Sequence, residues 1–438
     1  MALLRIDTLT PQAEGLGRLS GRVVFVPGAL PGETVEIERL EEKKNYSRAR
    51  LVGVLEPSPD RVDPPCPHFG LCGGCQLQHL PAAAQDRFKS DSFRIALGHA
   101  LKQPDPPTQP LMDAPRRWQY RQRLRLKLGG LGRRRVLGFY QARSHHLIPI
   151  NRCLLAAPPI NDLLDFLGGR LADLPPLPEP ADLEIRLLGE MGEAVLVITG
   201  LTTHSPARQA ALARSLREKD QIRAVFFQKQ AAGPLTGPEV FTPERHAAVY
   251  RVPLGQAGRE IPLAVFPQVF SQVNQDQNRR LIALLADLPL WTSRDRILDL
   301  YCGQGNFSIP LSFGAGEVCG IESSAAAIEN AVWNRKINPE NRCRFIRAAA
   351  REGVSRLTRA GERPDWVLLD PPRSGAAAVI PALAGLKARG ILYISCEPMT
   401  LFRDLGRLLR DGWRLEWTRP LDFFPQTHHL ESLSLLSR

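Results

Sequence analysis

Short apolar runs alternate with segments of helical periodicity from about residue 263 to the end of the chain. Strands are predicted at 296–301, 317–321, 366–369 and 390–394, with one helix beginning at 308 and another at 324–336. Apolar runs of this length are typical of parallel strands that are covered on both faces. The alternation predicts a doubly wound, Rossmann-like α/β sheet with a ligand crevice at the carboxyl ends of its strands.

Residues 1–60 follow a different pattern. Stretches of alternating apolar and polar residues, such as 22–27 and 34–38, are separated by turns that are rich in glycine and proline. Several short strands in so few residues predict a small, OB-like β-barrel.

A central α+β domain is predicted between these two regions. The expected elements are a helix at 81–101, proline-rich linkers at 104–115 and 171–180, and strands at 121–128, 136–140, 183–188, 194–199 and 224–228. The chain therefore divides into three expected domains, 1–60, 61–262 and 263–438.

Composition narrows the class of protein. Of the 438 residues, 43% are hydrophobic and 23% are charged, which is ordinary for a globular protein. No apolar run reaches the roughly 18 residues of a membrane span, and the first residues lack a signal-peptide pattern, so a cytoplasmic monomer is expected. The formal net charge of +12 favours a polyanionic partner, because cations that neutralise phosphates release counterions.

The positive charge is concentrated between residues 116 and 135, which hold nine basic residues and no acidic one. Arg121, Arg123, Arg125 and Lys127 alternate with leucines, so a strand would place these four cations on one face. Such a run can be a merely solvated face. The absence of acidic residues favours contact with RNA phosphates instead.

The first strand of the C-terminal region leads into Asp299-Leu-Tyr-Cys-Gly-Gln-Gly-Asn-Phe307. Gly303 and Gly305 would let the backbone approach a ligand, and Glu322, at the end of the next strand, could bind ribose hydroxyls. A dinucleotide site would have a third glycine near position 308, which is serine, so S-adenosyl-L-methionine fits better. The alternative is a plain turn beside a surface glutamate.

Three further candidates lie near the ends of predicted strands. Asp370 begins Asp-Pro-Pro-Arg373, in which Arg373 stands where enzymes that methylate exocyclic amino groups carry an aromatic residue. Cys396 follows an apolar strand, and Glu431 lies in the apolar segment 430–436, where an unpaired carboxylate is costly to bury. A thiol and a carboxylate near a methyl-donor site therefore call for a chemical explanation.

Methylation of carbon 5 of a pyrimidine requires both groups. Carbon 5 of uracil is a poor nucleophile, but addition of a thiolate to carbon 6 creates an enolate that can attack a methyl sulfonium. A base must then remove the proton from carbon 5 so that the thiol can leave. We therefore interpret Cys396 as the nucleophile and Glu431 as the base.

The cysteines form a second candidate site. Cys66, Cys72 and Cys75 crowd a glycine-rich loop, and without a secretory signal they favour a metal or cluster over disulfides. Zinc could take His68 or His79 as a fourth ligand, whereas an iron–sulfur cluster would prefer Cys153. Three other cysteines are interpreted as structural, namely Cys302, Cys319 and Cys343.

Together these motifs resemble the RNA uracil-5 methyltransferase family, in the branch that carries a TRAM domain and an iron–sulfur cluster and modifies 23S ribosomal RNA. The likeness covers nearly the whole chain, and the segment from Gly21 to Glu33 looks like part of a TRAM domain. The resemblance implies methylation of carbon 5 of a uridine in 23S ribosomal RNA, before or during subunit assembly. Two alternatives are the same chemistry on a transfer RNA and a non-catalytic RNA-binding protein that retains the fold.

The family motifs also imply roles for individual residues. Cys396 matches the nucleophile and Glu431 the base. The implied ligands of a [4Fe-4S] cluster are Cys66, Cys72, Cys75 and Cys153. The implied donor-site residues are Gln272, within Phe270-Ser-Gln-Val-Asn274, and Tyr301, Asn306, Glu322 and Asp370. One departure is the expected third strand, 344–350, which has alanines where relatives place a polar residue near the adenine.

Overall fold

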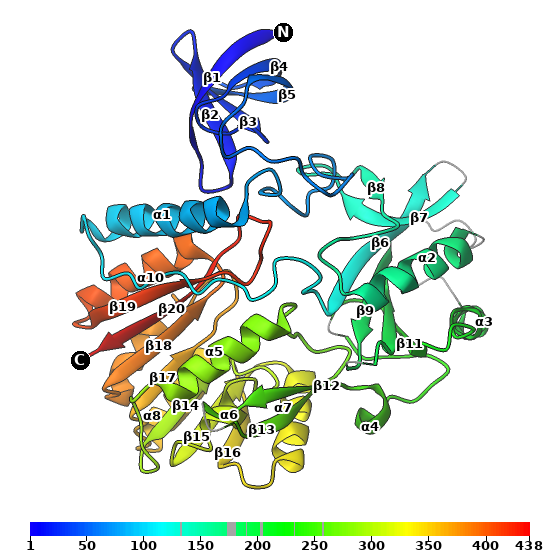
Figure 1. Ribbon diagram of the computed structural model, residues 1–438. Helices are drawn as coiled ribbons and strands as arrows, with labels where there is room; N and C mark the ends of the chain where they lie inside the picture. Colours follow the sequence, from blue (N-terminus) through cyan, green and yellow to red (C-terminus); the bar gives the residue numbers. More distant parts are fainter. Residues whose placement is uncertain (132–133, 173–180, 190, 202–204, 232, 256–257) are drawn as a thin grey trace. The chain divides into compact units, whose positions relative to one another are not determined.

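The chain folds into two compact units that interleave along the sequence. The computed structural model describes residues 1–438 except 132–133, 173–180, 190, 202–204, 232 and 256–257 (Figure 1). The first unit comprises 1–117, 139–148 and 419–431, and the second comprises 118–138, 149–418 and 432–438. The domain boundaries predicted at 60 and 262 stay predictions. Most of the linker predicted at 171–180 lies outside the described residues.

The first unit begins with a closed five-stranded barrel. Its strands are β1 (Ala2–Leu9), β2 (Glu14–Leu19), β3 (Arg22–Pro27), β4 (Thr34–Glu42) and β5 (Tyr46–Glu56), in the order β1-β2-β3-β5-β4. Alternate side chains fill the interior because neighbouring residues of a strand point to opposite faces. The buried core consists of Leu4, Ile6, Val24, Val26, Ala29, Val35, Ile37 and Ala49. The barrel prediction is confirmed.

The rest of the first unit is built around helix α1 (Ala82–Leu101), which matches the predicted helix. The cysteine-rich loop precedes α1 and contacts the 139–148 segment, where the Gly73 amide donates a hydrogen bond to the Tyr140 carbonyl. Segment 109–117 lies beside 419–422, since the Met112 amide donates to the Pro420 carbonyl at 2.9 Å. Pieces that are distant in sequence thus form one unit.

A six-stranded sheet has the strand order β11-β10-β9-β6-β7-β8. Its strands are β6 (Arg123–Leu131), β7 (Arg134–Tyr140), β8 (Leu147–Pro149), β9 (Ala181–Leu187), β10 (Ala194–Thr199) and β11 (Ile222–Gln228). Helices α2 (Pro158–Ala172) and α3 (Pro206–Leu216) pack with β9 and β11. Each strand predicted in this region is found, and each of its ends lies within three residues of the predicted one.

A seven-stranded sheet has the strand order β16-β15-β14-β17-β18-β20-β19. Its strands are β14 (Arg296–Leu300), β15 (Glu317–Glu322), β16 (Cys343–Arg347), β17 (Trp366–Leu369), β18 (Gly390–Ser395), β19 (Arg414–Leu421) and β20 (Glu431–Ser437). The first five strands of this order run parallel, and β20 lies antiparallel to β18. The doubly wound fold is confirmed.

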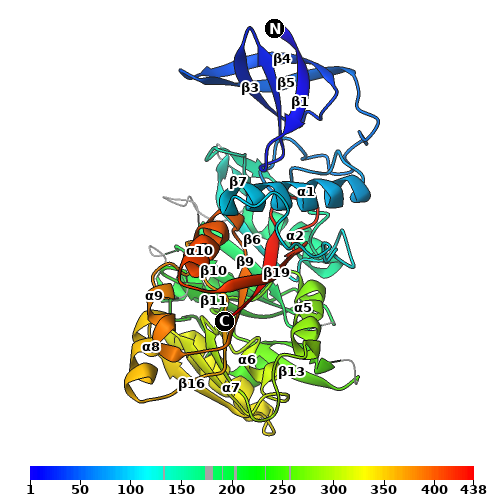
Figure 2. The ribbon, with the colours of Figure 1, turned by 90° about the vertical axis from the view of Figure 1, so that its left-hand side faces the viewer.

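Helices cover both faces of this sheet, as Figure 2 shows with α8 and α10 on one side and α5 on the other. One group consists of α8 (Ala350–Arg359), α9 (Ile380–Leu383) and α10 (Pro398–Arg410), which contact one another. The other consists of α5 (Gln275–Asp287), α6 (Ser308–Leu311) and α7 (Ala325–Ile337), together with the hairpin of β12 (Ala248–Pro253) and β13 (Glu260–Val265). A short helix, α4 (Pro243–His246), precedes the hairpin.

The strand order reverses between β14 and β17, because the chain moves outward from β14 to β16 and returns on the other side. Such a switch point leaves a crevice outside the carboxyl ends of the strands, where ligands bind in open α/β sheets. The expected third strand is shorter than predicted. It ends at Arg347, and Ala350 already begins α8, so the alanines serve the strand-to-helix turn.

Candidate active site

The loop after β14 contains three residues with positive φ, namely Tyr301, Gly303 and Gly305. Tyr301 has φ +66°, and its amide donates to the Ile321 carbonyl at 2.9 Å. Gly303 and Gly305 have φ of +55° and +83°, and a Cβ at Gly305 would lie 3.1 Å from Cζ of Phe345. The two glycines therefore allow the tight turn that was predicted from the sequence.

Glu322, the last residue of β15, contacts this loop. Its Oε2 accepts a hydrogen bond from the Gly303 amide at 3.3 Å, and its Oε1 accepts one from the Ser324 amide at 2.7 Å. The side chain is half-buried. The structure thus brings Gly303, Tyr301 and Glu322 together at the carboxyl edge of the sheet, with an acidic acceptor suited to ribose hydroxyls.

Two more carboxyl groups lie at this edge. Asp299 is fully buried, its Oδ2 accepts from the Ser308 hydroxyl at 2.5 Å, and its Oδ1 has no hydrogen-bond partner among the described residues. Burial raises its pKa to about 7, with the Asp370 and Glu322 charges adding to the shift. Burial likewise raises the pKa of Asp370 to about 7. An unsatisfied buried acceptor beside two further acids fits a positively charged, hydroxyl-bearing ligand such as S-adenosyl-L-methionine.

Asn306 lies in a polar network that fixes the loop. It exchanges two hydrogen bonds of 2.9 Å with the side chain of Asn278 on α5. The Tyr250 hydroxyl donates to Asn306 Oδ1 at 2.9 Å and accepts from Gln304 at 3.1 Å. Burial raises the pKa of Tyr250. Asn306 therefore anchors the turn on α5 and β12, in addition to its predicted contact with the donor.

Gln272 lies in the connection between β13 and α5, where its side chain is half-buried. This connection is fastened by the fully buried Arg186 of β9, which donates to the carbonyls of Phe266 and Val269 at 3.1 and 2.9 Å. Asn274 then caps α5 by accepting from the Gln277 amide. These hydrogen bonds could not be predicted from the sequence, because Arg186 lies about 80 residues before the segment that it holds.

Cys396 follows the last residue of β18 and precedes α10 by two residues. The Ser395 hydroxyl accepts from the Glu397 amide at 3.2 Å, which shapes the turn between strand and helix. The first turn of α10 begins at Pro398, two residues after Cys396. Cys396 is half-buried, unlike the buried Cys302, Cys319 and Cys343.

Asp370 and Cys396 stand at the ends of adjacent strands, β17 and β18, of one parallel ladder. Asp404 of α10 joins the two connections, because it accepts from the Tyr393 hydroxyl and from the Ala376 amide, both at 2.7 Å. Gly375 is required here, since a Cβ would lie 2.5 Å from Asp404 Oδ2. Asp404 was missed from the sequence because nothing near it in the chain marks it as a contact of the loop after Asp370.

Glu431 is the first residue of β20 and is buried, with 3% of its surface exposed. The β18–β20 ladder pairs Ser395 with Ser432 as its last pair at this end. Cys396 and Glu431 are the covalent neighbours of that pair, one on each strand. An antiparallel ladder therefore sets the two predicted catalytic residues one step beyond the same pair, at the edge where β14 and β17 also end.

The four cysteines predicted to hold a cluster are divided between the units. Cys66, Cys72 and Cys75 lie in the first unit and Cys153 in the second. All four are half-buried and none forms a disulfide. In the described part of the chain, no three Cys, His, Asp or Glu side chains gather as a metal-binding group, so the metal prediction is not confirmed. Of the alternative zinc ligands, His79 is fully buried, which lowers its pKa to about 4.

The basic strand is β6, and its cations face acids of the neighbouring β9. Arg125 lies opposite Glu184 and bonds to it at 3.0 Å, while Lys127 lies opposite Asp182 and bonds to it at 2.6 Å. Arg123 lies 3.7 Å from Glu184, and burial lowers its pKa to about 10. Arg121 precedes the strand and is half-buried. Three of the four cations are thus partly neutralised within the protein, and their contact with RNA stays a prediction.

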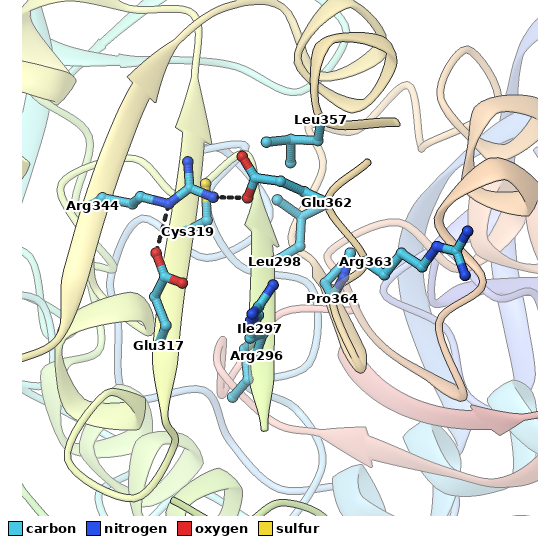
Figure 3. Close-up of a pocket in the computed structure, with 10 residues that line it drawn as sticks. All are labelled: Arg296, Ile297, Leu298, Glu317, Cys319, Arg344, Leu357, Glu362, Arg363 and Pro364. Atoms are coloured by element: carbon cyan, nitrogen blue, oxygen red, sulfur yellow. Dashed lines mark hydrogen bonds and ion pairs between the residues drawn. The ribbon is translucent and has the colours of Figure 1, made fainter. Parts of the chain in front are cut away.

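One small cavity opens at the opposite edge of the seven-stranded sheet, near the amino ends of β14 and β15 (Figure 3). Its volume of about 20 Å³ holds about one water molecule. Arg344 lies between Glu317 and Glu362 and forms ion pairs with both, so the charges at its mouth are compensated. This cavity is too small and too far along the strands to belong to the candidate donor site.

Comparison with known proteins identifies the family. The tRNA (uracil-5-)-methyltransferase family matches residues 119–438, and a TRAM domain matches residues 3–52. The chain belongs to the RNA uracil-5-methyltransferase family. The predicted class of enzyme, its TRAM domain and its methyltransferase fold are thereby confirmed.

Relatives and a solved structure agree with this assignment. The chain is 34% identical over 436 residues to the 23S rRNA (uracil(1939)-C(5))-methyltransferase RlmD of Shewanella sp. (strain W3-18-1), covering 99% of this chain and 94% of the relative. It is 36% identical to the protein of that name from Yersinia enterocolitica, covering 98% and 94%. It shares the fold of the Pyrococcus abyssi tRNA (uracil-54, C5)-methyltransferase in complex with S-adenosyl-L-homocysteine, with a TM-score of 0.72, 24% identity and coverage of 99% and 98%.

No helix among the described residues combines the length and the apolar character that a bilayer-spanning segment needs.

Proposed function

We propose that this enzyme transfers a methyl group from S-adenosyl-L-methionine to carbon 5 of a uridine in 23S ribosomal RNA. The observation that carries the proposal is the Ser395–Ser432 ladder pair, whose neighbours are Cys396 and Glu431. The choice of ribosomal RNA is supported by the names of the full-length relatives.

The chemistry runs in three steps. The Cys396 thiolate adds to carbon 6 of the unstacked uracil, which forms a C–S bond and makes carbon 5 an enolate nucleophile. Bound S-adenosyl-L-methionine would supply the methyl group that carbon 5 accepts, and breaking of the methyl–sulfur bond would leave S-adenosyl-L-homocysteine. Glu431 then removes the proton from carbon 5, the electron pair restores the carbon 5–carbon 6 double bond, and the thiolate of Cys396 is released.

The donor would be held at the carboxyl edge of the sheet. Glu322 would accept from the ribose hydroxyls, and the Gly303 turn would pass close to the adenosine. Asp370 and Asp299 would offset the positive sulfonium charge, which suits their uncompensated position. The remaining proposed contacts are Gln272, Tyr301 and Asn306.

A trapping experiment tests the reaction. The enzyme is incubated with methyl-labelled S-adenosyl-L-methionine and a 23S fragment that contains 5-fluorouridine. Fluorine at carbon 5 cannot leave as a proton, so the product should stay bonded to the protein. A labelled adduct that maps to Cys396 supports the proposal, and its loss in Cys396→Ala is the control.

The outcome also separates the alternatives. An adduct with a transfer RNA fragment and none with the 23S fragment would assign the same chemistry to transfer RNA. Binding of both RNAs without any adduct would indicate a non-catalytic RNA-binding protein. A matched fragment with uridine in place of 5-fluorouridine should release methylated RNA and leave no adduct.

A [4Fe-4S] cluster on Cys66, Cys72, Cys75 and Cys153 is a separate part of the proposal. Its support is the chemistry of the ligand set, since four half-buried cysteine thiols that form no disulfide suit iron and sulfide. Within the first unit, the Gly74 amide also donates to Sγ of Cys72 at 3.4 Å, a contact that favours an anionic sulfur. Anaerobic purification followed by iron and sulfide analysis tests it. About four of each per chain are expected, and Cys72→Ser should lose them.

A further inference from the structure

The segment that leads to Glu431 is fastened by two fully buried polar side chains of α1, Gln85 and Lys89. All of these contacts lie within the first unit, which includes residues 1–117 and 419–431. We propose that Gln85 and Lys89 are positioning residues, which fix segment 422–429 and thereby hold the base Glu431 in the place required for proton removal. The inference rests on the proposed function.

Gln85 binds the segment through both ends of its amide. Its Nε2 donates to Oε1 of Gln426 at 3.0 Å, and its Oε1 accepts from the Gln426 backbone amide at 3.2 Å. The same Nε2 donates to the carbonyls of Leu77 and Leu80 at 3.0 and 2.9 Å. One side chain thus connects the end of the cysteine-rich loop, α1 and Gln426.

Gln426 is held in a conformation that it would not adopt alone. Its φ is +69°, a left-handed conformation that is strained for a residue other than glycine. Its carbonyl accepts from the amides of Gln76 and Leu77, both at 3.0 Å. With the two contacts from Gln85, the backbone amide, the backbone carbonyl and the side-chain Oε1 of Gln426 are all engaged, so the turn is specified by its surroundings.

Lys89 anchors the segment one turn of helix further along. Its Nζ lies 2.6 Å from Oδ1 of Asp422 and donates to the Phe424 carbonyl at 3.0 Å. Both charged groups are almost fully buried, and Arg117 also pairs with Asp422 at 3.3 Å. A buried ion pair adds little stability over apolar residues of the same size, so its best-attested use is to specify one arrangement.

A short hydrogen-bond chain continues from this anchor towards the base. The Thr427 hydroxyl donates to the Phe424 carbonyl at 2.8 Å and accepts from the His429 amide at 3.2 Å. His428 Nδ1 lies 3.1 Å from Oε1 of Gln76. Glu431 follows two residues after His429. Displacement of the turn at Gln426 would therefore act on the segment that ends at the base Glu431. The nucleophile Cys396 follows β18 and is not part of that segment.

This division of roles predicts a specific kinetic signature. Without an effective base, carbon 5 keeps its proton after methylation and the carbon 6–sulfur bond cannot break. A natural, unfluorinated RNA should then accumulate as a methylated covalent adduct. Loss of general stability would instead lower adduct formation and product release together.

The test compares variants in single-turnover reactions with labelled S-adenosyl-L-methionine and the uridine-containing 23S fragment. Gln85→Met keeps the side-chain volume and removes the hydrogen bonds. Lys89→Met leaves Asp422 paired with Arg117. Glu431→Gln is the reference for a lost base, and Leu97→Ala, a fully buried residue three turns further along α1, is the control for lost packing.

For Gln85→Met we expect release of methylated RNA to slow about tenfold, while formation of the adduct changes less than about threefold. Label should collect in denaturant-stable adduct, as in Glu431→Gln and unlike Leu97→Ala. Equal losses in both steps for Gln85→Met and Lys89→Met, with a trapped adduct in Glu431→Gln, would overturn the inference and leave the proposed function intact. Absence of adduct in Glu431→Gln would remove the proposed base, and the inference would fall with it.

Discussion

Charged residues are compensated at one end of the strands of the seven-stranded sheet and not at the other. We call the amino ends of the strands the amino edge and their carboxyl ends the carboxyl edge. At the amino edge, Arg344 forms ion pairs with Glu317, at 2.6 Å, and with Glu362. At the carboxyl edge, Asp299, Glu322 and Asp370 form no ion pair with any of the described residues. Glu322 accepts hydrogen bonds from backbone amides, and Asp299 accepts one from the Ser308 hydroxyl. Asp299, Glu317, Glu322 and Arg344 all lie within strands, so the difference depends on which residues stand at the two ends of the same strands.

This contrast indicates that the carboxyl groups of the carboxyl edge are suited to pair with a positively charged ligand. At the amino edge, charged side chains pair with one another within the protein, so they have no need of a charged ligand. Buried carboxyl groups with raised pKa values are costly to the fold, and such groups concentrate at functional sites. The comparison therefore predicts that equivalent substitutions at the two edges have unequal effects.

The largest difference is expected between two cysteines. Cys396→Ala should lower methyl transfer by about 10³-fold or more, because the covalent route to an activated carbon 5 is lost. Cys319→Ala, at the amino edge, should leave the rate within about twofold, since burial raises the pKa of that thiol to about 12 and keeps it neutral. Single-turnover rates with bound RNA measure both. Comparable losses in the two variants would abolish the distinction.

A smaller difference is expected between two glutamates. Glu322→Gln should weaken binding of S-adenosyl-L-methionine by about 10- to 50-fold, because a charged acceptor for hydroxyl groups is lost. Glu317→Gln should leave the affinity unchanged. Calorimetric titration of both variants checks this, and unaltered binding in Glu322→Gln would exclude the ribose contact.

Asp299 should impose a pH-dependent cost on folding. Its pKa is raised from 3.8 in the unfolded chain to about 7 in the fold, so the folded state holds a proton that the unfolded state has lost. The free energy of unfolding should therefore fall as pH rises from about 4 to about 7 and level off above that. Asp299→Asn removes this cost and should be more stable than the wild type at pH 8, by on the order of 1 to 2 kcal/mol.

Urea unfolding without ligand at pH 5 and pH 8 measures the effect of Asp299→Asn. The advantage of the variant should be larger at pH 8 than at pH 5. A constant difference at the two pH values would show that Asp299 is ionised throughout this range in the folded state.

The smallest effect is expected at the amino edge. Arg344→Met removes ion pairs of a half-exposed side chain, so the free energy of unfolding should fall by less than about 1 kcal/mol. Methyl transfer should not change. Thermal unfolding and a rate assay measure both quantities, and a loss of activity would place function at this edge as well.

The fold could be predicted further from the sequence than the site. The β10 and β17 strands have the bounds that the apolar runs predicted, because buried strands are marked by their own residues. The short strand β16 was extended too far, since alanines fit a strand and a helix equally well. Short-range preference could not decide that boundary.

The charged strand β6 shows why the site was harder to predict. Its own sequence contains no acid, which suggested a free basic face, yet Glu184 and Asp182 on β9 lie directly opposite Arg125 and Lys127. These acids are more than 50 residues away in the chain. Only strand pairing reveals such neutralisation, because it depends on register rather than on local composition.

The sequence by itself determined the class of fold, the glycine turn at 303–305 and the residue types needed for chemistry at carbon 5. Each of these is encoded locally, by apolar periodicity, by glycines that adopt positive φ without strain, or by a thiol and a carboxylate at strand ends. The tertiary structure alone decided which charges are compensated, and how α1 holds the segment before Glu431. Those properties arise between residues such as Gln85 and Gln426, which are 341 positions apart, and their energy depends on burial and distance that no local pattern records.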